Sequence, residues 1–253
     1  MNWQAMSEGV LGIVVLAAGK GTRMNSDLPK VLHRVHTKPM IEYVTETAVS
    51  LAGEFVYIVV GHQADRVRQE ISKRFNVRYV HQKKLLGTGD AVKSALPMLD
   101  RRIEYVLVMC GDVPLIRQQT LHDLVESHRK NRNCLTVLAA EVEDPEGYGR
   151  IILDGTGRIK CIREQADANE EEKKIRIVNS GIFCFDKRFL EDCIPMITAE
   201  NEQKEYYLTD AIEIAARNGK QSGVKIMENP EEMTGVNTSE QLAWMEKLLQ
   251  SID

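Results

Sequence analysis

Cations and glycines follow the first apolar run of the sequence. The stretch "VVLAAGKGTRM" occupies Val14–Met24, and "PK" follows at Pro29 and Lys30. Glycines let backbone N–H groups approach an anion, and the side chains of Lys20, Arg23 and Lys30 can neutralise its charge. These residue types at this spacing predict a site that binds phosphate groups.

The two familiar phosphate-binding motifs do not fit this loop. Gly19 and Gly21 match the start of the dinucleotide pattern G-x-G-x-x-G, but Met24 stands at its third glycine. The P-loop pattern needs a lysine after its second glycine, whereas Lys20 precedes Gly21. A tight turn or a solvated charged loop is the structural alternative. Neither explains why cations gather in a long loop, and long loops in compact domains tend to be functional.

A carboxylate stands at the end of another apolar run. Asp112 follows the run in "VMCGDVPL". In parallel sheets ligands bind beyond the carboxyl ends of the strands, and carboxylate oxygens are ligands that Mg²⁺ prefers. Asp112 is therefore a candidate ligand for a magnesium ion on a phosphate chain. The alternative is that Asp112 caps the helix that follows.

The first half of the chain alternates between short apolar runs and amphipathic segments. This alternation predicts a Rossmann-like α/β fold with a doubly wound, mostly parallel sheet. We expect strands at 10–18, 54–61, 77–82 and 104–112, and helices at 40–52, 63–75, 88–99 and 119–131, with Pro97 weakening the third helix near its end.

The second half is richer in β-branched residues. We expect strands at 134–142, 149–164, 174–186 and 222–228, with "DGTG" as a hairpin turn, a loop or short helix at 166–174, a helix at 209–219 that ends at Gly219, and a closing helix at 238–251 capped by Thr238 or Ser239. No repeat or linker interrupts the chain. The sequence therefore predicts a single domain, 1–253, with β-rich insertions in its second half.

Composition excludes several classes of protein. The chain has 253 residues and a net charge of −4, which gives no electrostatic footprint for nucleic acid. No apolar run approaches the roughly 18 residues of a membrane span, and the N-terminus lacks signal-peptide features. We therefore expect a cytoplasmic protein that binds neither nucleic acid nor membranes. Its cysteines form no C-x-x-C pair and are expected to be reduced core residues: Cys110, Cys134, Cys161, Cys184 and Cys193.

The loop resembles the signature of sugar-phosphate nucleotidyltransferases, L-A-A-G-x-G-T-R-M, a short gap and P-K. Further motifs of the family follow in order: "QKKLLGTGDA", "CGDVPL", "DPEGYGRI", "IRE", "VNSGIF", "EYYLTD" and "GVNTSEQL". They extend from Leu11 to Leu242. Within this family, the chain resembles the uridyltransferase half of the bifunctional bacterial enzymes that make UDP-N-acetylglucosamine. The resemblance implies the nucleotide-diphospho-sugar transferase fold, with 1–133 as the nucleotide-binding half and 134–253 as the sugar-binding half and closing helix.

The resemblance implies a nucleotide site. Arg23 would lie near the β- and γ-phosphates, and Lys30 near the α-phosphate and the incoming sugar phosphate. Gln82, Gly87 and Thr88 would read the uracil edge, because an amide both donates and accepts hydrogen bonds. The implied nucleotide-binding residues are Leu16, Ala17, Ala18, Gly19, Gly21, Arg23, Lys30, Gln82, Gly87, Thr88, Gly111 and Asp112. Arg23, Lys30 and Asp112 are the implied catalytic residues.

The resemblance also implies a sugar site and a metal pair. The implied sugar-binding residues are Gly149, Glu164, Asn179, Tyr207, Thr209 and Asn237. Tyr206, Tyr207 and Thr209 are candidate wall residues with a weaker claim. Glu164 would accept hydrogen bonds from hydroxyls, and Gly149 would lie beside the acetamido group. The family pairs Asp112 with Asn237 as ligands of Mg²⁺. From sequence alone, Glu164 could be a surface charge, Asn179 a turn residue and Asn237 a helix cap.

The implied reaction needs no covalent nucleophile. An oxygen of N-acetylglucosamine 1-phosphate would attack the α-phosphorus of UTP in line and expel pyrophosphate. The nucleophile is already anionic, so no general base is required, and the protein must align two anions and stabilise their charge. We therefore expect no catalytic histidine among His33, His36, His62, His81, His122 and His128.

The sequence departs from the family in two places. The fused members carry an acetyltransferase domain of hexapeptide repeats, which this sequence lacks, so we expect a shortened form or a stand-alone enzyme. Because that domain builds the trimer, we expect a monomer or weak dimer. Cys110 stands where an aromatic residue is common. The alternative functions are transfer to another sugar phosphate or from another nucleotide, and a non-catalytic nucleotide-sugar sensor, which should have lost the cations or Asp112.

Overall fold

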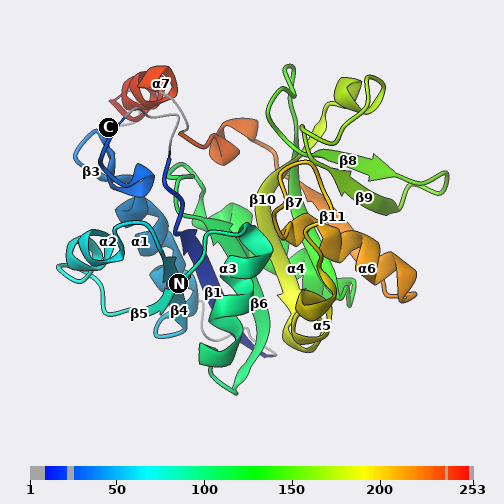
Figure 1. Cartoon of the computed structure of the whole chain (residues 1–253), viewed down its shortest axis with the longest axis horizontal. Helices are drawn as coiled ribbons and strands as arrows, with labels where there is room; N and C mark the ends of the chain where they lie inside the picture. The colour runs from blue at the N-terminus through cyan, green and yellow to red at the C-terminus, as the bar shows by residue number, and fades with distance from the viewer. Residues whose placement is uncertain (1–8, 22–25, 237–238, 251–253) are drawn as a thin grey trace.

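A single nine-stranded sheet forms the centre of the molecule (Figure 1). The computed structural model describes residues 9–21, 26–236 and 239–250. The main path of the sheet runs β11-β7-β10-β6-β1-β4-β5, and β8 and β9 extend it beside β10. The strands are β1 (Val10–Ala17), β4 (Val56–Val60), β5 (Arg78–His81), β6 (Ile103–Cys110), β7 (Leu135–Glu141), β8 (Arg150–Leu153), β9 (Ile159–Arg163), β10 (Ile177–Asp186) and β11 (Ser222–Ile226).

The sheet is mixed but mostly parallel, which confirms the predicted fold class. β1 pairs in parallel with β4 and β6, β4 with β5, and β7 with β11. β10 runs antiparallel to both β6 and β7, in the middle of the sheet. Apolar runs form these strands because both faces are covered; every residue of β4 is buried.

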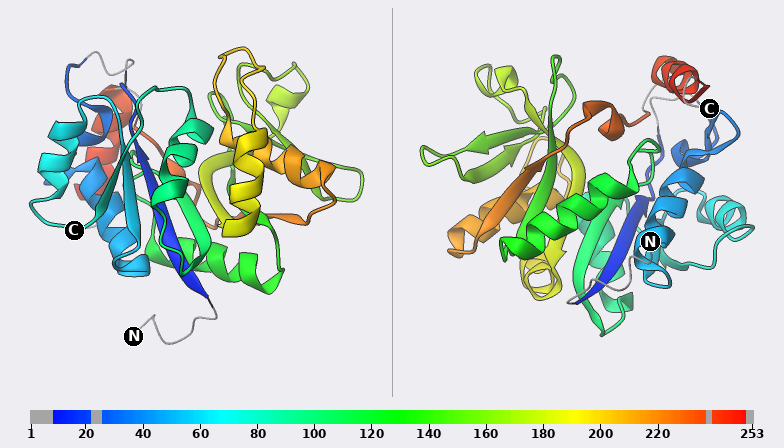
Figure 2. Two further views of the ribbon diagram at one scale, coloured as in Figure 1. Left: turned by 60° about the horizontal axis from the view of Figure 1, so that its bottom comes forward. Right: turned by 180° about the vertical axis from the view of Figure 1, so that it is seen from behind.

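Helices cover both faces of the sheet (Figure 2). On one face, α1 (Met40–Ala52), α2 (Ala64–Ile71) and α4 (Gln118–Lys130) enclose a core that includes Ile13, Ile58 and Leu107. On the other face, α3 (Thr88–Ala95), α5 (Lys187–Cys193) and α6 (Ala211–Arg217) enclose a second core. None of the helices in the described ranges combines the length and apolar character needed to cross a bilayer.

Short elements connect this framework. They are η3 (Lys30–Leu32), β2 (Arg34–Val35), β3 (Lys38–Pro39), η4 (Leu96–Met98), η5 (Glu172–Lys174), η6 (Ile194–Met196), η7 (Leu208–Asp210) and η8 (Pro230–Met233). The last helix, α7 (Ser239–Gln250), returns to the N-terminal half. There Met245 packs with Val35, Met40 and Val236 in a small separate core.

Most element boundaries agree with the sequence, and the differences have local causes. The helix predicted at 88–99 ends at Ala95, and Pro97 lies in the first turn of η4. The "DGTG" hairpin and the helix end at Gly219, where φ is +64°, are confirmed. Helix α5 was not predicted; the Asp186 side chain caps it by accepting from the Phe189 amide. The predicted caps of α7 lie outside the described residues and side chains.

Candidate functional site

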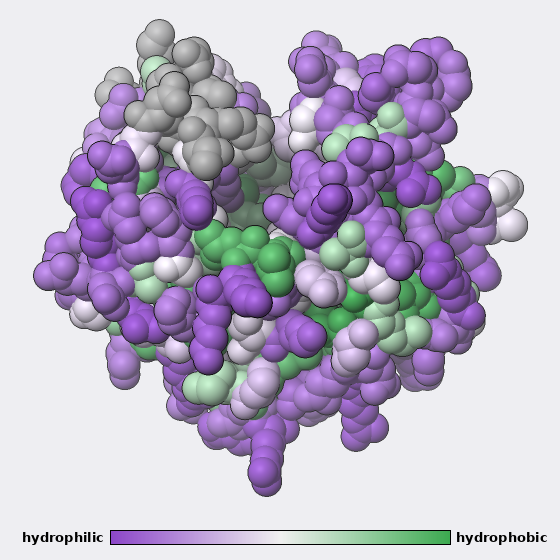
Figure 3. Space-filling view, in the orientation of Figure 1, coloured by the Kyte–Doolittle hydropathy of each residue, from purple (hydrophilic) through white to green (hydrophobic). Residues whose placement is uncertain are grey.

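A cavity of about 520 Å³ opens at the carboxyl ends of β1, β5 and β6. The surface is hollowed between the side that bears α7 and the side that bears β8 and β9, and hydrophobic residues lie within the hollow (Figure 3). The cavity is lined by Leu16, Ala17, Ala18, Gly19, Lys20, Lys30, Val31, Gln82, Leu85, Gly87, Thr88, Ala91, Cys110, Asp112 and Glu205. Nine of these are among the twelve predicted nucleotide-binding residues.

Backbone hydrogen bonds fix the loop that follows β1. The carbonyl of Leu16 accepts from the Gly111 amide at 2.9 Å, and that of Ala18 accepts from the His62 amide at 3.0 Å. Gly111 thus ties β6 to β1 and does not itself line the cavity. Gly21 packs against the side-chain stem of Lys30. Arg23, the predicted partner of the leaving phosphates, lies outside the described residues.

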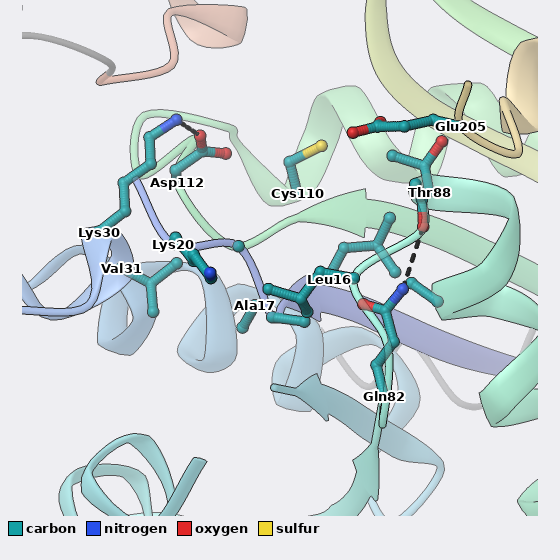
Figure 4. Close-up of a pocket in the computed structure, with 15 residues that line it drawn as sticks. Leu16, Ala17, Lys20, Lys30, Val31, Gln82, Thr88, Cys110, Asp112 and Glu205 are labelled. Carbon is teal, nitrogen blue, oxygen red and sulfur yellow. Dashed lines mark hydrogen bonds and ion pairs between the residues drawn. The ribbon is translucent and has the colours of Figure 1, made fainter. Parts of the chain in front are cut away.

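Two opposite charges meet at one end of the cavity (Figure 4). The Lys30 ammonium forms a salt bridge with the Asp112 carboxylate. Lys30 begins η3 after the long loop, and Asp112 lies in the turn after β6. Their side chains are 15% and 20% exposed, so both remain in contact with the open cavity. Topology therefore gathers a cation and an anion from distant parts of the chain.

The other end of the cavity holds an amide of fixed orientation. Gln82 is 4% exposed, and its Nε2 donates to the Gly87 carbonyl at 3.2 Å and to Asp90 Oδ2 at 2.8 Å. The Gln82 side chain and this bond to the Gly87 loop are visible in Figure 4. Because a carboxylate and a carbonyl can only accept, the NH₂ group must face them. The amide oxygen is left to accept from a ligand.

A segment of the second half closes this end of the cavity. The Gly89 amide donates to the Tyr206 carbonyl at 2.8 Å, and the Leu208 amide donates to Thr88 Oγ1 at 3.1 Å. Gly87 has φ +103°, and a methyl group there would lie 2.7 Å from the Tyr206 carbonyl oxygen, so glycine is required. The segment 205–209 is therefore packed directly on the loop that carries Gly87 and Thr88.

The predicted sugar-binding residues form a connected cluster next to the cavity. The backbone amide of Asn179 donates to the Gly149 carbonyl at 2.8 Å, and Thr209 Oγ1 donates to Glu164 Oε1 at 3.0 Å. A Cβ on Gly149 would lie 3.2 Å from the other oxygen of Glu164. Burial raises the pKa of the Glu164 carboxyl group. Asn237, the sixth predicted residue, lies outside the described residues.

This cluster adjoins the cavity without lining it. Glu164 and Tyr207 line a second pocket of about 350 Å³ near α6. Burial, together with the charges of Asp167 and Glu164, raises the pKa of the Tyr207 hydroxyl. The link to the cavity runs through Cys110, whose Sγ lies 3.8 Å from the Gly181 carbonyl oxygen, two residues after Asn179.

Several lining residues were not predicted as site residues. Val31, Leu85, Ala91 and Glu205 lie beside the predicted motifs, and only the fold shows that they face the cavity. Lys20 had been identified as a possible phosphate cation, and it does line the cavity. Cys110 lines it too, with a thiol pKa raised by burial to about 12. This thiol is therefore neutral rather than nucleophilic at physiological pH.

The protein groups fit a metal ion that is shared with a substrate. Among the described residues, no cluster of three or more His, Cys, Asp or Glu side chains could hold a metal ion. Among the described lining residues, Asp112 places a carboxylate at the end of the cavity that also holds Lys30. Mg²⁺ is commonly held by one or two carboxylates together with substrate phosphates, so this donor set suits it.

Comparison with known proteins identifies relatives over almost the whole chain. The "Nucleotidyl transferase" family model matches residues 13–245. The bifunctional protein GlmU of Alkaliphilus metalliredigens is 43% identical over 240 residues, covering 95% of this chain and 52% of that protein. GlmU of Geotalea uraniireducens is 43% identical over 239 residues, covering 94% and 52%. This chain thus spans about half the length of these curated relatives.

A solved structure shows the same fold. A Bacillus anthracis protein described as a glucose-1-phosphate thymidylyltransferase, determined in complex with sucrose, superposes with a TM-score of 0.74. The match covers 96% of this chain and 97% of that chain at 19% sequence identity. At this identity, the likeness concerns the fold alone.

Proposed function

Because the chain belongs to the nucleotidyl transferase family, we propose that it transfers a uridylyl group from UTP to N-acetylglucosamine 1-phosphate. A phosphate oxygen of the sugar phosphate attacks the α-phosphorus of UTP. The bond from that phosphorus to the bridging oxygen of the β-phosphate breaks, and pyrophosphate leaves. The products are UDP-N-acetylglucosamine and pyrophosphate. The ordered motifs of the sequence support this assignment.

The fixed amide of Gln82 is the observation that carries the choice of uracil over cytosine. Its NH₂ group is held by Gly87 and Asp90, so its oxygen is the group offered to a ligand. Uracil presents an N3–H donor that this oxygen can accept, whereas the N3 atom of cytosine is an acceptor and would face another acceptor. Gly87 and Thr88 complete this end of the cavity, with Leu16–Gly19 as its floor.

The cations at the opposite end support binding of the phosphates. Lys30 lines the cavity there beside Asp112, and Arg23 belongs to the same loop in the sequence. Lys20 lines this cavity and also a smaller pocket that it shares with Gln82. Asp112 would hold Mg²⁺ with Asn237, and the bound ion would neutralise charge on the phosphate oxygens. The residues of this chain hold the two anions in line and stabilise the charge that develops on the phosphoryl group.

The sugar phosphate would lie on the side of the cavity that faces the second half of the chain. Glu164 is oriented by Thr209, and the Asn179 side-chain oxygen accepts from the Gly181 amide at 2.9 Å. The Asn179 NH₂ group then remains to donate to the sugar. Tyr207 and Gly149 flank Glu164. We assign residues 1–133 to the nucleotide and residues 134–253 to the sugar and the closing helix.

Pyrophosphate release tests the proposal. The chain is incubated with Mg²⁺, one of four nucleoside triphosphates and a panel of sugar 1-phosphates. The proposal expects the highest kcat/KM with UTP and N-acetylglucosamine 1-phosphate. A higher kcat/KM with another pair would show that the proposed substrates are wrong but the proposed reaction type is right. Nucleotide-sugar binding without turnover by any pair would make the chain a sensor.

A further inference from the structure

A buried carboxylate on η8 has no role in the reaction described above. Glu232 is 5% exposed, and Oε2 accepts from the Arg117 amide at 3.1 Å and from Thr120 Oγ1 at 2.6 Å. Its partners lie more than a hundred residues earlier, at the start of α4. A carboxylate is buried only where hydrogen bonds or charges compensate its lost hydration, so this contact is specific.

Glu232 supplies the N-terminal cap that α4 lacks. The helix begins after Arg117, which makes no side-chain capping bond, and its first turn contains no acidic residue. The first amides of a helix need acceptors, and a negative charge there is favourable. The Arg117 guanidinium lies 3.7 Å from Glu232, but its side chain is 65% exposed, so water screens this ion pair. The capping bonds are therefore the main interaction.

Two segments that meet at Glu232 also meet at Asp112. The turn that carries Asp112 leads directly into α4, and η8 leads directly to Val236. The Val236 amide donates to the Asp112 carbonyl at 3.2 Å. Met233 and Val236 are 2% and 0% exposed, so the intervening segment is anchored in the core. The contacts of Glu232 with the start of α4 and the backbone bond from Val236 thus join the segment 232–236 to both ends of the Asp112 turn.

We propose that Glu232 is a positioning residue for Asp112. It fixes the start of α4 against η8, and thereby the direction in which the Asp112 carboxylate enters the cavity. This inference rests on the proposed function, in which Asp112 holds the metal ion. Residues that orient a metal ligand change metal affinity, typically by about 10- to 100-fold, without touching the ion.

The test compares Glu232→Ala and Glu232→Gln with the exposed neighbour Glu231→Gln as a matched control. Glutamine can still accept from the Arg117 amide, whereas alanine cannot. We expect Glu232→Ala to raise the Mg²⁺ concentration for half-maximal pyrophosphate release about 10-fold. The KM for the sugar phosphate should change much less. Glu232→Gln should retain much of the wild-type behaviour, and Glu231→Gln all of it.

Amide hydrogen exchange provides a readout that is independent of turnover. Glu232→Ala should increase exchange at 111–117 and 234–236 while leaving β10 and α6 protected. Thr120→Val removes the hydrogen bond from Thr120 Oγ1 to Glu232. It replaces Glu232→Ala in the test if that variant does not fold. If Glu232→Ala leaves both the Mg²⁺ dependence and the amide protection of 234–236 unchanged, the inference is overturned. It is also overturned if every kinetic constant is impaired equally and amide exchange rises throughout the protein. A wild-type chain without turnover would refute the proposed function, while the exchange experiment would still test the positioning.

Discussion

The Lys30 ammonium forms a salt bridge with the Asp112 carboxylate, although the two residues are 82 positions apart in the sequence. In this arrangement each charge neutralises the other at one end of the cavity. A triphosphate and its metal ion would offer each group a new partner of opposite charge. We therefore expect the salt bridge to separate when the substrates bind. Before binding, the salt bridge keeps either charge from being buried without a partner.

Replacing Lys30 by methionine should affect the chemical step most. The cation would be lost where charge builds on the phosphoryl oxygens, and such losses reduce kcat by about 10²- to 10³-fold. Steady-state kinetics with saturating substrates measures this effect. Lys187→Met is a matched control, because Lys187 is equally covered, at 14% exposure, and pairs with Glu191 on α5. A similar loss of kcat in both variants would contradict the role of Lys30.

Changing Asp112 to asparagine should abolish Mg²⁺-dependent turnover with little change in folding. The amide keeps the shape of the side chain but removes the charge that holds the metal ion. Its backbone contacts, including the bond from the Val236 amide, do not depend on the side chain. Activity is followed across a Mg²⁺ titration and folding by thermal melting. Full activity at ordinary Mg²⁺ concentrations would refute the metal assignment.

Loss of the Gln82 amide should reduce the preference for UTP. Gln82→Leu would remove the acceptor for the uracil N3–H, which corresponds to about 1–3 kcal/mol, or about 5- to 150-fold in kcat/KM for UTP. Asp90→Asn offers a finer comparison. An asparagine can donate as well as accept, so only the Gly87 carbonyl would still favour the original orientation of the Gln82 amide. We expect CTP to become a better substrate relative to UTP, and an unchanged ratio would argue against readout by this amide.

Truncation of Glu164 should weaken binding of the sugar phosphate selectively. Glu164→Ala would remove an acceptor for sugar hydroxyls and leave Thr209 without its partner. We expect the KM for N-acetylglucosamine 1-phosphate to rise about 10- to 100-fold while the KM for UTP stays nearly constant. Glu170→Gln, an exposed position on the neighbouring loop, is the control. Equal effects on both KM values would place Glu164 outside the sugar site.

The carboxyl group of Asp210 should make stability depend on pH. Burial, followed by the charges of Glu213 and Asp167, raises its pKa from 3.8 to about 6. The folded state therefore binds this proton more tightly than the unfolded state does. The resulting stabilisation is complete below pH 3.8 and is lost as the pH rises to about 6.

Asp210→Asn should remove this dependence. At pH 7.5 the variant should be more stable by about 1 kcal/mol, after allowance for solvent screening. That corresponds to a rise in Tm of about 2–4 °C, whereas the two proteins should melt alike near pH 4. Melting curves at several pH values measure the difference. The exposed Asp192→Asn serves as control, and an equal gain at both pH values would contradict the explanation.

Much of the fold was predictable because local signals agree with the topology. Continuous apolar runs indicated the buried strands, and Pro97 and Gly219 marked the ends of two helices. The antiparallel course of β10 was not predictable, because its apolar pattern is compatible with either direction. Helix α5 was missed because its seven residues follow β10 directly, without an intervening loop. Its cap at Asp186 was the one local signal that could have indicated it.

The candidate site was predictable only where residues belong to motifs. Lys30, Gln82 and Asp112 stand at motif positions, and the fold brings them to one cavity. Asp90 and Glu232 were not identified, because their importance depends on partners that a sequence does not place beside them. Asp90 becomes informative only once Gln82 donates to it. Glu232 becomes informative only once α4 begins against η8.

The packing of α7 on β2 and the start of α1 has a consequence for synthesis of the protein. Met245 completes a core with Val35 and Met40, which the ribosome makes some two hundred residues earlier. The segment from Glu232 to Val236 must also be synthesised before its hydrogen bonds can hold the Asp112 turn in place. A nascent chain could therefore form β1, β4 and β6 early and yet remain inactive. Catalytic competence would appear only after α7 has emerged from the ribosome and docked.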